Sequence, residues 1–423
     1  MSRSTIGTSP TSNRWLIAIA AFIVQLALGS VYAWSVFLNP VIKAFGVTKP
    51  AANLTFSITL LALGITAGFG GYLQSRFGPR TIATTGGILY GLGIILAGLT
   101  TPAHSLPLLY LTYGIIGGIG IGLGYIVPLA MLIKWFPDRR GFITGLAVAG
   151  FGLGALLTAQ IAPPLLDPKL SSYIGLNSTF LYLGVAYLII VVIAAQFFRR
   201  APDGYAPAGW VPSARVQEVR STRDYTLQEA LRAPRWYVLW LILALNVTAG
   251  AALISVASPL AQSFTGVTPV VAGTLVSVIS IFNGAGRLVW GWVSDAIGRP
   301  FTFLSLFIIQ IVAFAVLPSI STFAILLIPC ALIALCYGGG FGTMPAFAAD
   351  FFGPKNAGTI YGAMLTAWSA GGIVGPLLIA SINTRTALYI IAGIMVVSCA
   401  LPLVARMLAR QEQAVEVVVQ SSK

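Results

Sequence analysis

The sequence predicts an all-α membrane protein of twelve transmembrane helices arranged in two halves. Hydrophobic residues make up 57% of the 423 residues and charged residues only 8%, with a mean hydropathy of +0.91. These values lie far outside the range of ordinary soluble domains. A helix that crosses a membrane needs about 20 mostly apolar residues. Twelve runs of this kind predict helices at 15–38, 52–74, 80–100, 106–134, 141–165, 176–198, 236–262, 269–297, 301–318, 323–352, 357–382 and 385–408.

The first of these runs is expected to stay in the protein as a helix. At 15–38 it is too long for the apolar region of a signal peptide, and no A-x-A cleavage pattern follows it. Cys330, Cys336 and Cys399 fall within predicted helices and His104 in a short loop, a spacing that suits neither a disulfide framework nor a metal site. The spans also lack a set of nucleophile, base and orienting acid. We therefore expect no cofactor, no bound metal and no enzymatic activity.

The positive charges predict how the chain is oriented. With both termini in the cytoplasm, nineteen of the 24 Lys and Arg residues fall on the cytoplasmic side, and only Lys43, Lys49, Lys169 and Arg385 face outward. This asymmetry follows the positive-inside rule. The net charge of +14 therefore indicates topology in a cell (inner) membrane and contact with anionic lipid headgroups, not binding of nucleic acid.

The chain divides into two halves that repeat each other. The hydrophobic signal stops at a Pro-, Gly- and charge-rich segment, which predicts an N-terminal six-helix bundle at 1–198, a cytoplasmic linker at 199–235, a C-terminal six-helix bundle at 236–410 and a cytoplasmic tail at 411–423. Motifs recur across the linker at a nearly fixed offset. GGYLQSRFGPR at 70–80 corresponds to WGWVSDAIGRP at 290–300, and Pro128 lies 217 residues before Pro345. Such an offset is typical of duplicated membrane folds.

These motifs resemble those of the major facilitator superfamily over essentially the whole chain. Within that superfamily, NRW at 13–15, YAWSVFLNPV at 32–41, WFPDRRG at 135–141 and LRAPRWYVLW at 231–240 resemble the oxalate/formate antiporter family and its monocarboxylate-transporter relatives. The resemblance implies the major facilitator fold, with a conformational motif in each half: Gly71, Arg76, Gly78 and Arg80 in the first, and Gly291, Asp295, Gly298 and Arg299 in the second. Ser75 stands where the first motif usually has an aspartate, so we expect a weaker conformational lock there.

Arg287 is a charge placed deep in the membrane. It lies about ten residues, or roughly 15 Å at 1.5 Å per residue, before the cytoplasmic end of the predicted helix 269–297. A charge there costs from ~3 to more than ~10 kcal/mol, so it should face the bundle interior and have a partner. All ten acidic residues fall in loops, at helix ends or in tails. A cavity that binds a carboxylate is the simplest account. An arginine that is bound to water or carbonyls and serves packing alone remains the alternative.

The remaining site residues come from one spacing and from the resemblance. Asn283 is four residues before Arg287 on the same helical face and can orient the guanidinium or bond a substrate hydroxyl. In the monocarboxylate transporters an aspartate tied to proton coupling usually takes the place of Asn283. By alignment to the oxalate/formate family, the residues that match its aromatic-lined site around Arg287 are Tyr32, Tyr125, Tyr337, Phe341, Leu365 and Trp368. Oxalate carriers have a lysine in place of Trp368, so a single cation here predicts a single carboxylate.

The resulting hypothesis is a secondary active transporter of a small monocarboxylate anion such as L-lactate or pyruvate, working by alternating access. The resemblance to monocarboxylate transporters implies symport with a proton, although no acid in the spans could carry that proton. An oxalate/formate-type organic anion exchanger is the alternative within transport. A carboxylate sensor that does not transport is a further one, but the linker and tail are short for a signalling domain.

Overall fold

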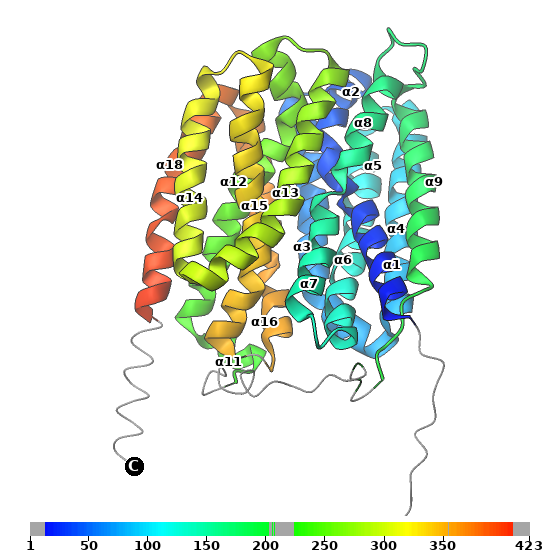
Figure 1. Ribbon diagram of the computed structural model, residues 1–423. Helices are drawn as coiled ribbons and strands as arrows, with labels where there is room; N and C mark the ends of the chain where they lie inside the picture. Colours follow the sequence, from blue (N-terminus) through cyan, green and yellow to red (C-terminus); the bar gives the residue numbers. More distant parts are fainter. Residues whose placement is uncertain (1–12, 203–204, 206, 208–223, 354, 409–423) are drawn as a thin grey trace, which may run out of the picture.

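The computed structural model describes residues 13–202, 205, 207, 224–353 and 355–408, and all regular structure within them is helical. Twelve of the described helical segments are long and apolar enough to cross a membrane (Figure 1). In a bilayer the backbone has no water to bond to, and a helix satisfies its peptide groups within the segment. The predicted all-α fold with twelve membrane-spanning helices is confirmed.

The first half contains six spans. In chain order its elements are α1 (Arg14–Leu28), a 3-10 turn (Gly29–Ala33), α2 (Trp34–Phe45), α3 (Lys49–Phe77), α4 (Pro79–Thr100), a 3-10 turn (Thr101–Ala103), α5 (Leu106–Leu109), a π-helical stretch (Tyr110–Ile116), α6 (Gly117–Trp135), α7 (Arg140–Gly152), α8 (Ala155–Leu166) and α9 (Gly175–Ala195). Several spans are therefore built from two or three helical pieces rather than from one regular helix.

The second half follows the linker, which contains the short helix α11 (Leu227–Arg232), and is more regular. Its elements are α12 (Pro234–Thr265), α13 (Pro269–Ile297), α14 (Arg299–Val316), a 3-10 turn (Leu317–Ser319), α15 (Phe323–Phe352), α16 (Ala357–Met364), α17 (Thr366–Ser381) and α18 (Thr384–Ser398). In Figure 1 the first half, coloured blue to green, lies on the right, and the second half, lime to red, lies on the left.

The structure differs from the predicted helices mainly at the end of the first span and within the linker. The first span continues through Pro40 to Phe45 instead of ending at Leu38, since a membrane helix tolerates a proline whose freed carbonyl is satisfied locally. The predicted linker contains the short helix α11, which begins with a capping box between Thr226 and Glu229. Most of residues 203–223, and the predicted tail at 411–423, lie outside the described residues.

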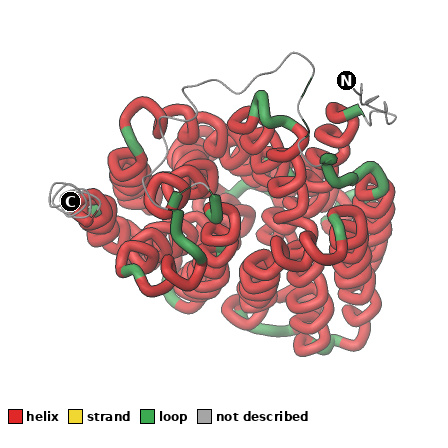
Figure 2. Tube along the Cα trace, turned by 90° about the horizontal axis from the view of Figure 1, so that it is seen from below, coloured by secondary structure: helices red, strands yellow, loops and turns green. Residues whose placement is uncertain are grey.

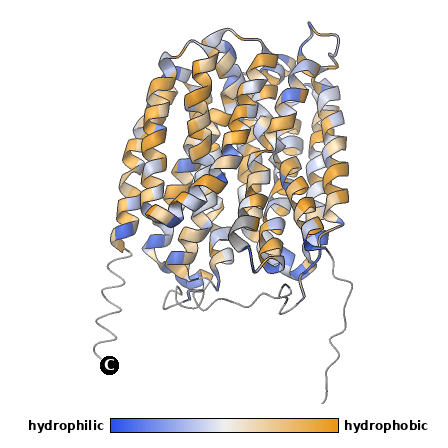
Figure 3. Ribbon diagram, in the orientation of Figure 1, coloured by the Kyte–Doolittle hydropathy of each residue, from blue (hydrophilic) through white to orange (hydrophobic). Residues whose placement is uncertain are grey.

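The distribution of hydrophobic side chains fits a lipid-embedded bundle. Figure 2 views the molecule from the end where the linker lies, with most helices seen nearly end-on, so they run along a common axis. We call this end the linker side. In Figure 3 hydrophobic residues cover the length of the outer helices, while hydrophilic residues gather near the two ends. Large apolar side chains such as Phe69, Trp292 and Val397 are exposed on the outside, as contact with lipid requires.

One ion pair joins two elements of the first half on the linker side. Arg14 donates two hydrogen bonds to the carboxylate of Asp138, at 2.7 and 3.1 Å. The guanidinium also lies 4.6 Å from the centroid of the Phe136 ring. The hydrogen bond from Arg14 holds the pKa of the Asp138 carboxyl below its usual value. The start of α1 is thereby fastened to the loop between α6 and α7.

The two halves meet mainly along five pairs of elements. From the first half, α3 packs against α17 and α16, the pair α7 and α8 packs against α13, and α2 packs against α12. The site described next lies where these contacts converge.

Candidate functional site

Arg287 lies in the interior of the bundle, ten residues before α13 ends at Ile297. Its side chain is 2% exposed. The Nε group donates to Asn283 Oδ1 at 3.3 Å, and Nη1 donates to the carbonyl oxygen of Val148 in α7 at 3.1 Å. The guanidinium carbon is 5.0 Å from the centroid of the Phe341 ring and 5.6 Å from that of Phe151, within the range of cation–π contacts. The arginine thus contacts both halves of the molecule.

No carboxylate of the described part of the chain balances this charge. Within it, the acidic residues Asp138, Asp167, Asp224, Glu229, Asp295 and Asp350 lie in loops, in the short linker helix or in the last turn of a span. None of the ion pairs among the described residues includes Arg287. The partners of Arg287 are an amide oxygen, a peptide carbonyl and two aromatic rings, which stabilise a cation without neutralising it.

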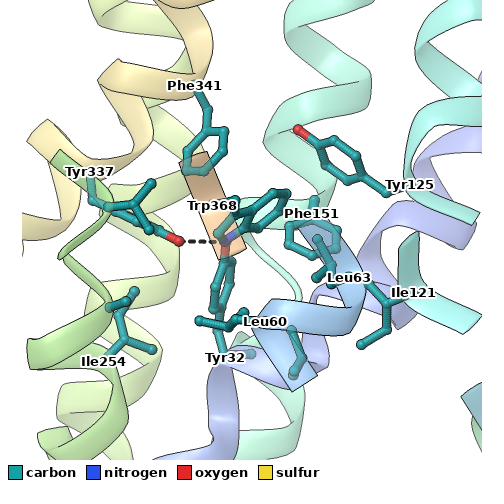
Figure 4. Close-up of a cluster of buried hydrophobic side chains, with 14 of the residues drawn as sticks. Tyr32, Leu60, Leu63, Ile121, Tyr125, Phe151, Ile254, Tyr337, Phe341 and Trp368 are labelled. Atoms are coloured by element: carbon teal, nitrogen blue, oxygen red, sulfur yellow. Dashed lines mark hydrogen bonds between the residues drawn. The ribbon is translucent and has the colours of Figure 1, made fainter. Parts of the chain in front are cut away.

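Aromatic side chains gather around Trp368 (Figure 4), and two of them, Phe341 and Phe151, also lie against the arginine. The centroid of the Trp368 ring is 4.5 Å from that of Phe341, 5.1 Å from that of Tyr125 and 5.5 Å from that of Phe151. Tyr32 and Tyr337 meet beside it, and their hydroxyl oxygens are 2.9 Å apart. The structure therefore brings together all eight sequence-predicted site residues, each no more than 2% exposed: Arg287, Asn283, Tyr32, Tyr125, Tyr337, Phe341, Leu365 and Trp368.

Several hydrogen-bond donors at this site have no partner among the described residues. They are Arg287 Nη2, Asn283 Nδ2, Trp368 Nε1 and the hydroxyls of Tyr125 and Tyr361. Leaving a buried donor unsatisfied costs about 1–3 kcal/mol, so a cluster of them around one cation is not explained by stability. Because each of these groups can donate, the arrangement suits a ligand that presents acceptor oxygens and a negative charge.

Two residues of this site escape prediction from the sequence. Phe151 in α7 contacts Tyr32, Tyr125 and Trp368 with its ring, and Tyr361 in α16 interacts with both Tyr125 and Arg287. An aromatic residue in a membrane span is by itself more often part of the packing than of a site. The available signal for Tyr361 was its spacing, since it lies four and seven residues before Leu365 and Trp368 and so shares their helical face.

Three of the spans that line the site are interrupted where they pass it. The first span changes to a 3-10 turn at Gly29–Ala33, which includes Tyr32. The fifth breaks between α7 and α8 at Leu153 and Gly154, and the eleventh breaks between α16 and α17 at Leu365. A side chain on Gly29 would overlap the Phe151 carbonyl, and one on Gly154 would overlap Gly29, so two of these breaks touch. Interrupted helices are a recurring feature of binding sites in membrane transport folds.

The site is enclosed on the side opposite the linker by hydrogen bonds between the halves. Asn53 of α3 donates to Ser255 Oγ in α12 at 3.1 Å and to the carbonyl of Pro376 in α17 at 2.9 Å. Gln160 of α8 donates to Ser277 Oγ in α13 at 2.8 Å. A cavity of about 560 Å³ opens beyond these contacts, lined by Lys43, Asn177, Gln262 and others, but the site residues do not line it.

From the level of the site toward the linker, α3 meets α16 and α17 mainly through close backbone approaches, with one hydrogen bond from Ser369 Oγ to the Leu61 carbonyl at 2.8 Å. A side chain on Gly64 of α3 would overlap Ser369 of α17, and one on Gly68 would lie 3.5 Å from the carbonyl oxygen of Gly362 in α16. Small residues let membrane helices approach in this way. Farther toward the linker, Gly71 and Gly358 have open space around them.

The two conformational motifs differ in their contacts. In the second, Arg299 pairs with Asp295 at 2.6 Å and with Asp350 at 3.0 Å, and it also donates to Ser294. In the first, the Ser75 hydroxyl bonds only the carbonyl of Tyr72 in its own helix. Gly78 and Gly298 both have positive φ, of 88° and 86°, and form the turns that glycine allows.

At the other positions, the described contacts of the first motif differ from those of the second. Arg76 lies over the Phe77 ring at 5.4 Å, and Arg80 is exposed at the start of α4. A side chain on Gly291 would approach the Gly342 carbonyl at 3.8 Å, whereas one on Gly71 would meet nothing within 4 Å. The C-terminal end of α3 instead contacts the start of the predicted linker, because Arg200 donates to the Ser75 carbonyl at 2.6 Å.

Comparison with known proteins identifies the family to which this chain belongs. The chain matches the family model for the Major Facilitator Superfamily over residues 17–376 and 239–420. The chain belongs to the major facilitator superfamily. Matched relatives include proteins described as a transporter of this type and as an antiporter, so this chain is a multi-pass membrane transporter by family.

Three relatives in the superfamily are similar over most of their length. The chain is 34% identical over 372 residues to an uncharacterized transporter of this type, YhjX of Escherichia coli strain K12, covering 85% of this chain and 86% of that protein. It is 30% identical over 394 residues to the oxalate:formate antiporter of Oxalobacter formigenes, covering 91% and 90%. It is 28% identical over 374 residues to the apicoplast pyruvate carrier 1 of Toxoplasma gondii, covering 75% and 68%.

A solved structure of the superfamily supports the fold. The model is similar to a bacterial homolog of the human lysosomal transporter Spinster, in an inward-facing and unoccupied conformation, with a TM-score of 0.70 at 16% sequence identity. The match covers 94% of this chain and 98% of that chain. At that identity the likeness extends to the fold alone.

Proposed function

We propose that this member of the superfamily is a secondary active transporter of small monocarboxylates such as L-lactate or pyruvate, coupled to protons. The observation that carries this proposal is the Arg287 cluster: a buried cation, unsatisfied donors beside it, and no carboxylate near it among the described residues. Both oxygens of a carboxylate accept hydrogen bonds and the group carries one negative charge, so a carboxylate anion would satisfy both the charge of Arg287 and the open donors beside it.

Each site residue has a distinct role in this proposal. Arg287 binds the carboxylate through Nη2, the one guanidinium nitrogen without a partner in the described structure. Asn283 holds the guanidinium with its Oδ1 atom and offers its Nδ2 group to the substrate. Phe341, Leu365 and Trp368 pack against the short carbon tail, and the tyrosine hydroxyls bond substrate oxygens.

Trp368 favours a monocarboxylate over a dicarboxylate. Its buried ring occupies the place at which the resemblance puts a lysine in oxalate carriers, and it leaves Arg287 as the single cation of the cluster. A second carboxylate would then be buried without a counter-charge, which costs several kcal/mol. A substrate with one carboxylate and a small apolar end matches both the charge and the ring surface.

Binding is linked to movement through the contacts of Arg287 across the halves. Its Nη1 group donates to Val148 of α7, while its own helix belongs to the second half. An anion that neutralises the guanidinium lowers the free-energy cost of closing the site off from water. It shifts the equilibrium between the two conformations of the halves by as much as its affinities for those conformations differ. The glycine contacts of α3 with α16 and α17 form a surface along which the halves can slide.

The energy source has two candidates. Proton symport fits the relationship to monocarboxylate carriers; because no described acid lies at the site, the substrate would then cross as the neutral acid, hydrogen-bonded to Arg287 without neutralising it. Anion exchange is favoured by the 30% identity to an oxalate:formate antiporter and by that same lack of an acid. We further propose that the protein lies in the cell (inner) membrane with both termini and the linker in the cytoplasm.

Uptake of labelled L-lactate into proteoliposomes tests this function. The wild-type protein is expected to accumulate L-lactate when the outside is made acidic, and Arg287→Gln is expected to lose saturable uptake while keeping its elution profile in detergent. Arg385→Gln, which removes an exposed arginine over Phe264, serves as the matched control and should transport normally.

The outcomes separate the candidates. Uptake only into vesicles preloaded with an unlabelled acid would indicate exchange. Normal uptake by Arg287→Gln would overturn the site, and no transport of any monocarboxylate under either condition would overturn the proposed function.

A further inference from the structure

Tyr361 carries a buried hydroxyl that the proposed carboxylate contacts leave unused. It lies in α16 with 4% of its surface exposed, and its hydroxyl has no hydrogen-bond partner among the described residues. Tyr361 interacts with Tyr125 and with Arg287, but the Tyr125 hydroxyl is also without a partner. The two hydroxyls therefore lie close enough to interact beside the cation, but not in the geometry of a full hydrogen bond.

A comparison with the other tyrosine pair of the site is informative. Tyr32 of the first half and Tyr337 of the second are hydrogen-bonded to each other at 2.9 Å, so this pair is satisfied in the ligand-free structure. Tyr125 in α6 and Tyr361 in α16 also come from opposite halves, but they leave two hydroxyls open. An oxygen atom of a ligand placed beside the second pair could bond one or both of these hydroxyls.

The number of open donors exceeds what a carboxylate needs. Arg287 Nη2 and Asn283 Nδ2 are sufficient to bind two carboxylate oxygens, which leaves Tyr125 and Tyr361 for a further oxygen. A phenolic hydroxyl both donates and accepts, so this pair can bond a keto oxygen, which only accepts, or a hydroxyl, which does both. In a 2-oxo or 2-hydroxy acid, that oxygen is attached to the carbon next to the carboxylate.

We propose that Tyr125 and Tyr361 bind the oxygen on carbon 2 of the substrate and make the site selective for 2-hydroxy and 2-oxo acids over unsubstituted monocarboxylates. This inference rests on the proposed function and adds a selectivity that Arg287 cannot supply. The oxygen on carbon 2 would also have a structural effect. Bonded to both tyrosines, it would join α6 to α16 and hold the halves together on the linker side.

The test compares L-lactate with propionate, which has the same three carbons but lacks the 2-hydroxyl. Purified wild-type protein and Tyr361→Phe are reconstituted, and KM and maximal rate are measured for each acid. The wild-type KM should be about a hundredfold lower for L-lactate than for propionate, the effect of two hydrogen bonds of about 1.4 kcal/mol each. Tyr361→Phe should raise the KM for L-lactate about tenfold, with a much smaller effect on the KM for propionate.

Two further variants complete the experiment. Tyr125→Phe should produce the same loss of discrimination, and Tyr389→Phe, which removes an exposed hydroxyl on α18, should produce none. A lactate-to-propionate KM ratio that stays at the wild-type value in Tyr361→Phe and Tyr125→Phe would overturn the inference. So would equal loss of both acids in these variants, because that would indicate a role in closure or folding rather than in selectivity. Wild-type protein that carries neither acid would instead overturn the proposed function.

Discussion

Trp368 places apolar surface beside the positive charge of the central site. Its ring is fully buried and lies within 5.5 Å, centroid to centroid, of Phe341, Tyr125 and Phe151. These rings fill the space beside Arg287 with apolar surface, and aromatic contacts of this kind add about 0.5–1.5 kcal/mol each beyond burial. The site therefore combines one cation with a rigid wall that suits a small carbon tail.

Replacing Trp368 with a cation should change the preferred anion. In Trp368→Lys, a second positive charge lies near Arg287, so oxalate is expected to bind about tenfold or more tightly than to the wild type, a gain of at least ~1.4 kcal/mol. L-Lactate should bind more weakly, and the ligand-free variant should melt at a lower temperature because an unpaired ammonium is buried. Equilibrium binding of both acids to purified protein measures these changes.

Trp368→Met is the matched control, since it removes the ring without adding charge. A gain in oxalate affinity of the same size in Trp368→Met would attribute the effect to space rather than to charge and would contradict the charge-matching account.

For single residues, the sequence reveals a costly buried charge such as Arg287, but not every side chain that lies next to it in the fold. Arg287 is identifiable because a cation in an apolar run is costly wherever it faces. The resemblance added the aromatic positions, and the structure places them together. Tyr361 was not identifiable because a lone tyrosine in a membrane helix is compatible with packing, with the lipid interface or with a site. Its proximity to Tyr125 arises only when α16 packs beside the first half.

The interrupted helices connect the site to the contacts between the halves. Leu153 and Gly154 separate α7 from α8 directly after Phe151 and Gly152. A side chain on Gly152 would lie 2.6 Å from the backbone nitrogen of Gly284 in α13, one turn before the level of Arg287. The break and the close approach occur together, so a shift of α7 relative to α13 would move Phe151 relative to the arginine.

An alanine at position 152 should separate these two helices. Gly152→Ala places a methyl group against Gly284, and overpacking of this kind costs about 1–3 kcal/mol. We expect a lower melting temperature and a reduced transport rate. Gly358→Ala is the control, because a methyl group there would meet nothing within 4 Å. Thermal unfolding that is the same for Gly152→Ala and Gly358→Ala would argue against the close packing of α7 and α13.

The sequence predicts where the helices lie much better than it predicts where they are interrupted. The runs of apolar residues predict the spans at 269–297 and 323–352 with the limits that α13 and α15 have. The 3-10 turn at Gly29–Ala33 and the break at Leu365 were not predicted. Hydropathy reports whether a segment can lie in lipid, whereas these breaks depend on what another helix places against the segment, such as Phe151 against Gly29.

Over the whole molecule, the halves are joined differently at the two ends of the bundle. Asn53 is the centre of the contacts opposite the linker, because it accepts from Trp34 Nε1 at 3.1 Å while donating to Ser255 and Pro376 across the interface. On the linker side, the described contacts between the halves are mainly glycine approaches. Hydrogen bonds between the halves must break when the side opposite the linker opens, so they set part of the energy difference between the two states.

Removing the Asn53 side chain should favour opening on that side. Asn53→Ala deletes two hydrogen bonds between the halves, each worth about 0.5–1.5 kcal/mol, and so should shift the equilibrium between states by about tenfold or more. Spin labels on cysteines introduced at the exposed positions Lys43 and Ser263, one in each half, measure the distance across this side. We expect a larger population at long distance than in the unmodified protein.

Asn177→Ala, which changes an exposed asparagine of α9, is the control for this measurement. Distance distributions that are identical in Asn53→Ala and Asn177→Ala would mean that the Asn53 contacts do not hold the two halves closed.

The lone charge of Arg287 also has an electrical consequence. A membrane potential of 100 mV acts on one elementary charge that crosses it with about 2.3 kcal/mol. In anion exchange, the site would change the side to which it opens only with an anion on the guanidinium, so this step would have no net charge for the voltage to drive. In proton symport, both the loaded and the empty site would change sides with one positive charge. The charge of Arg287 therefore makes the voltage dependence of this step differ between the two modes of transport.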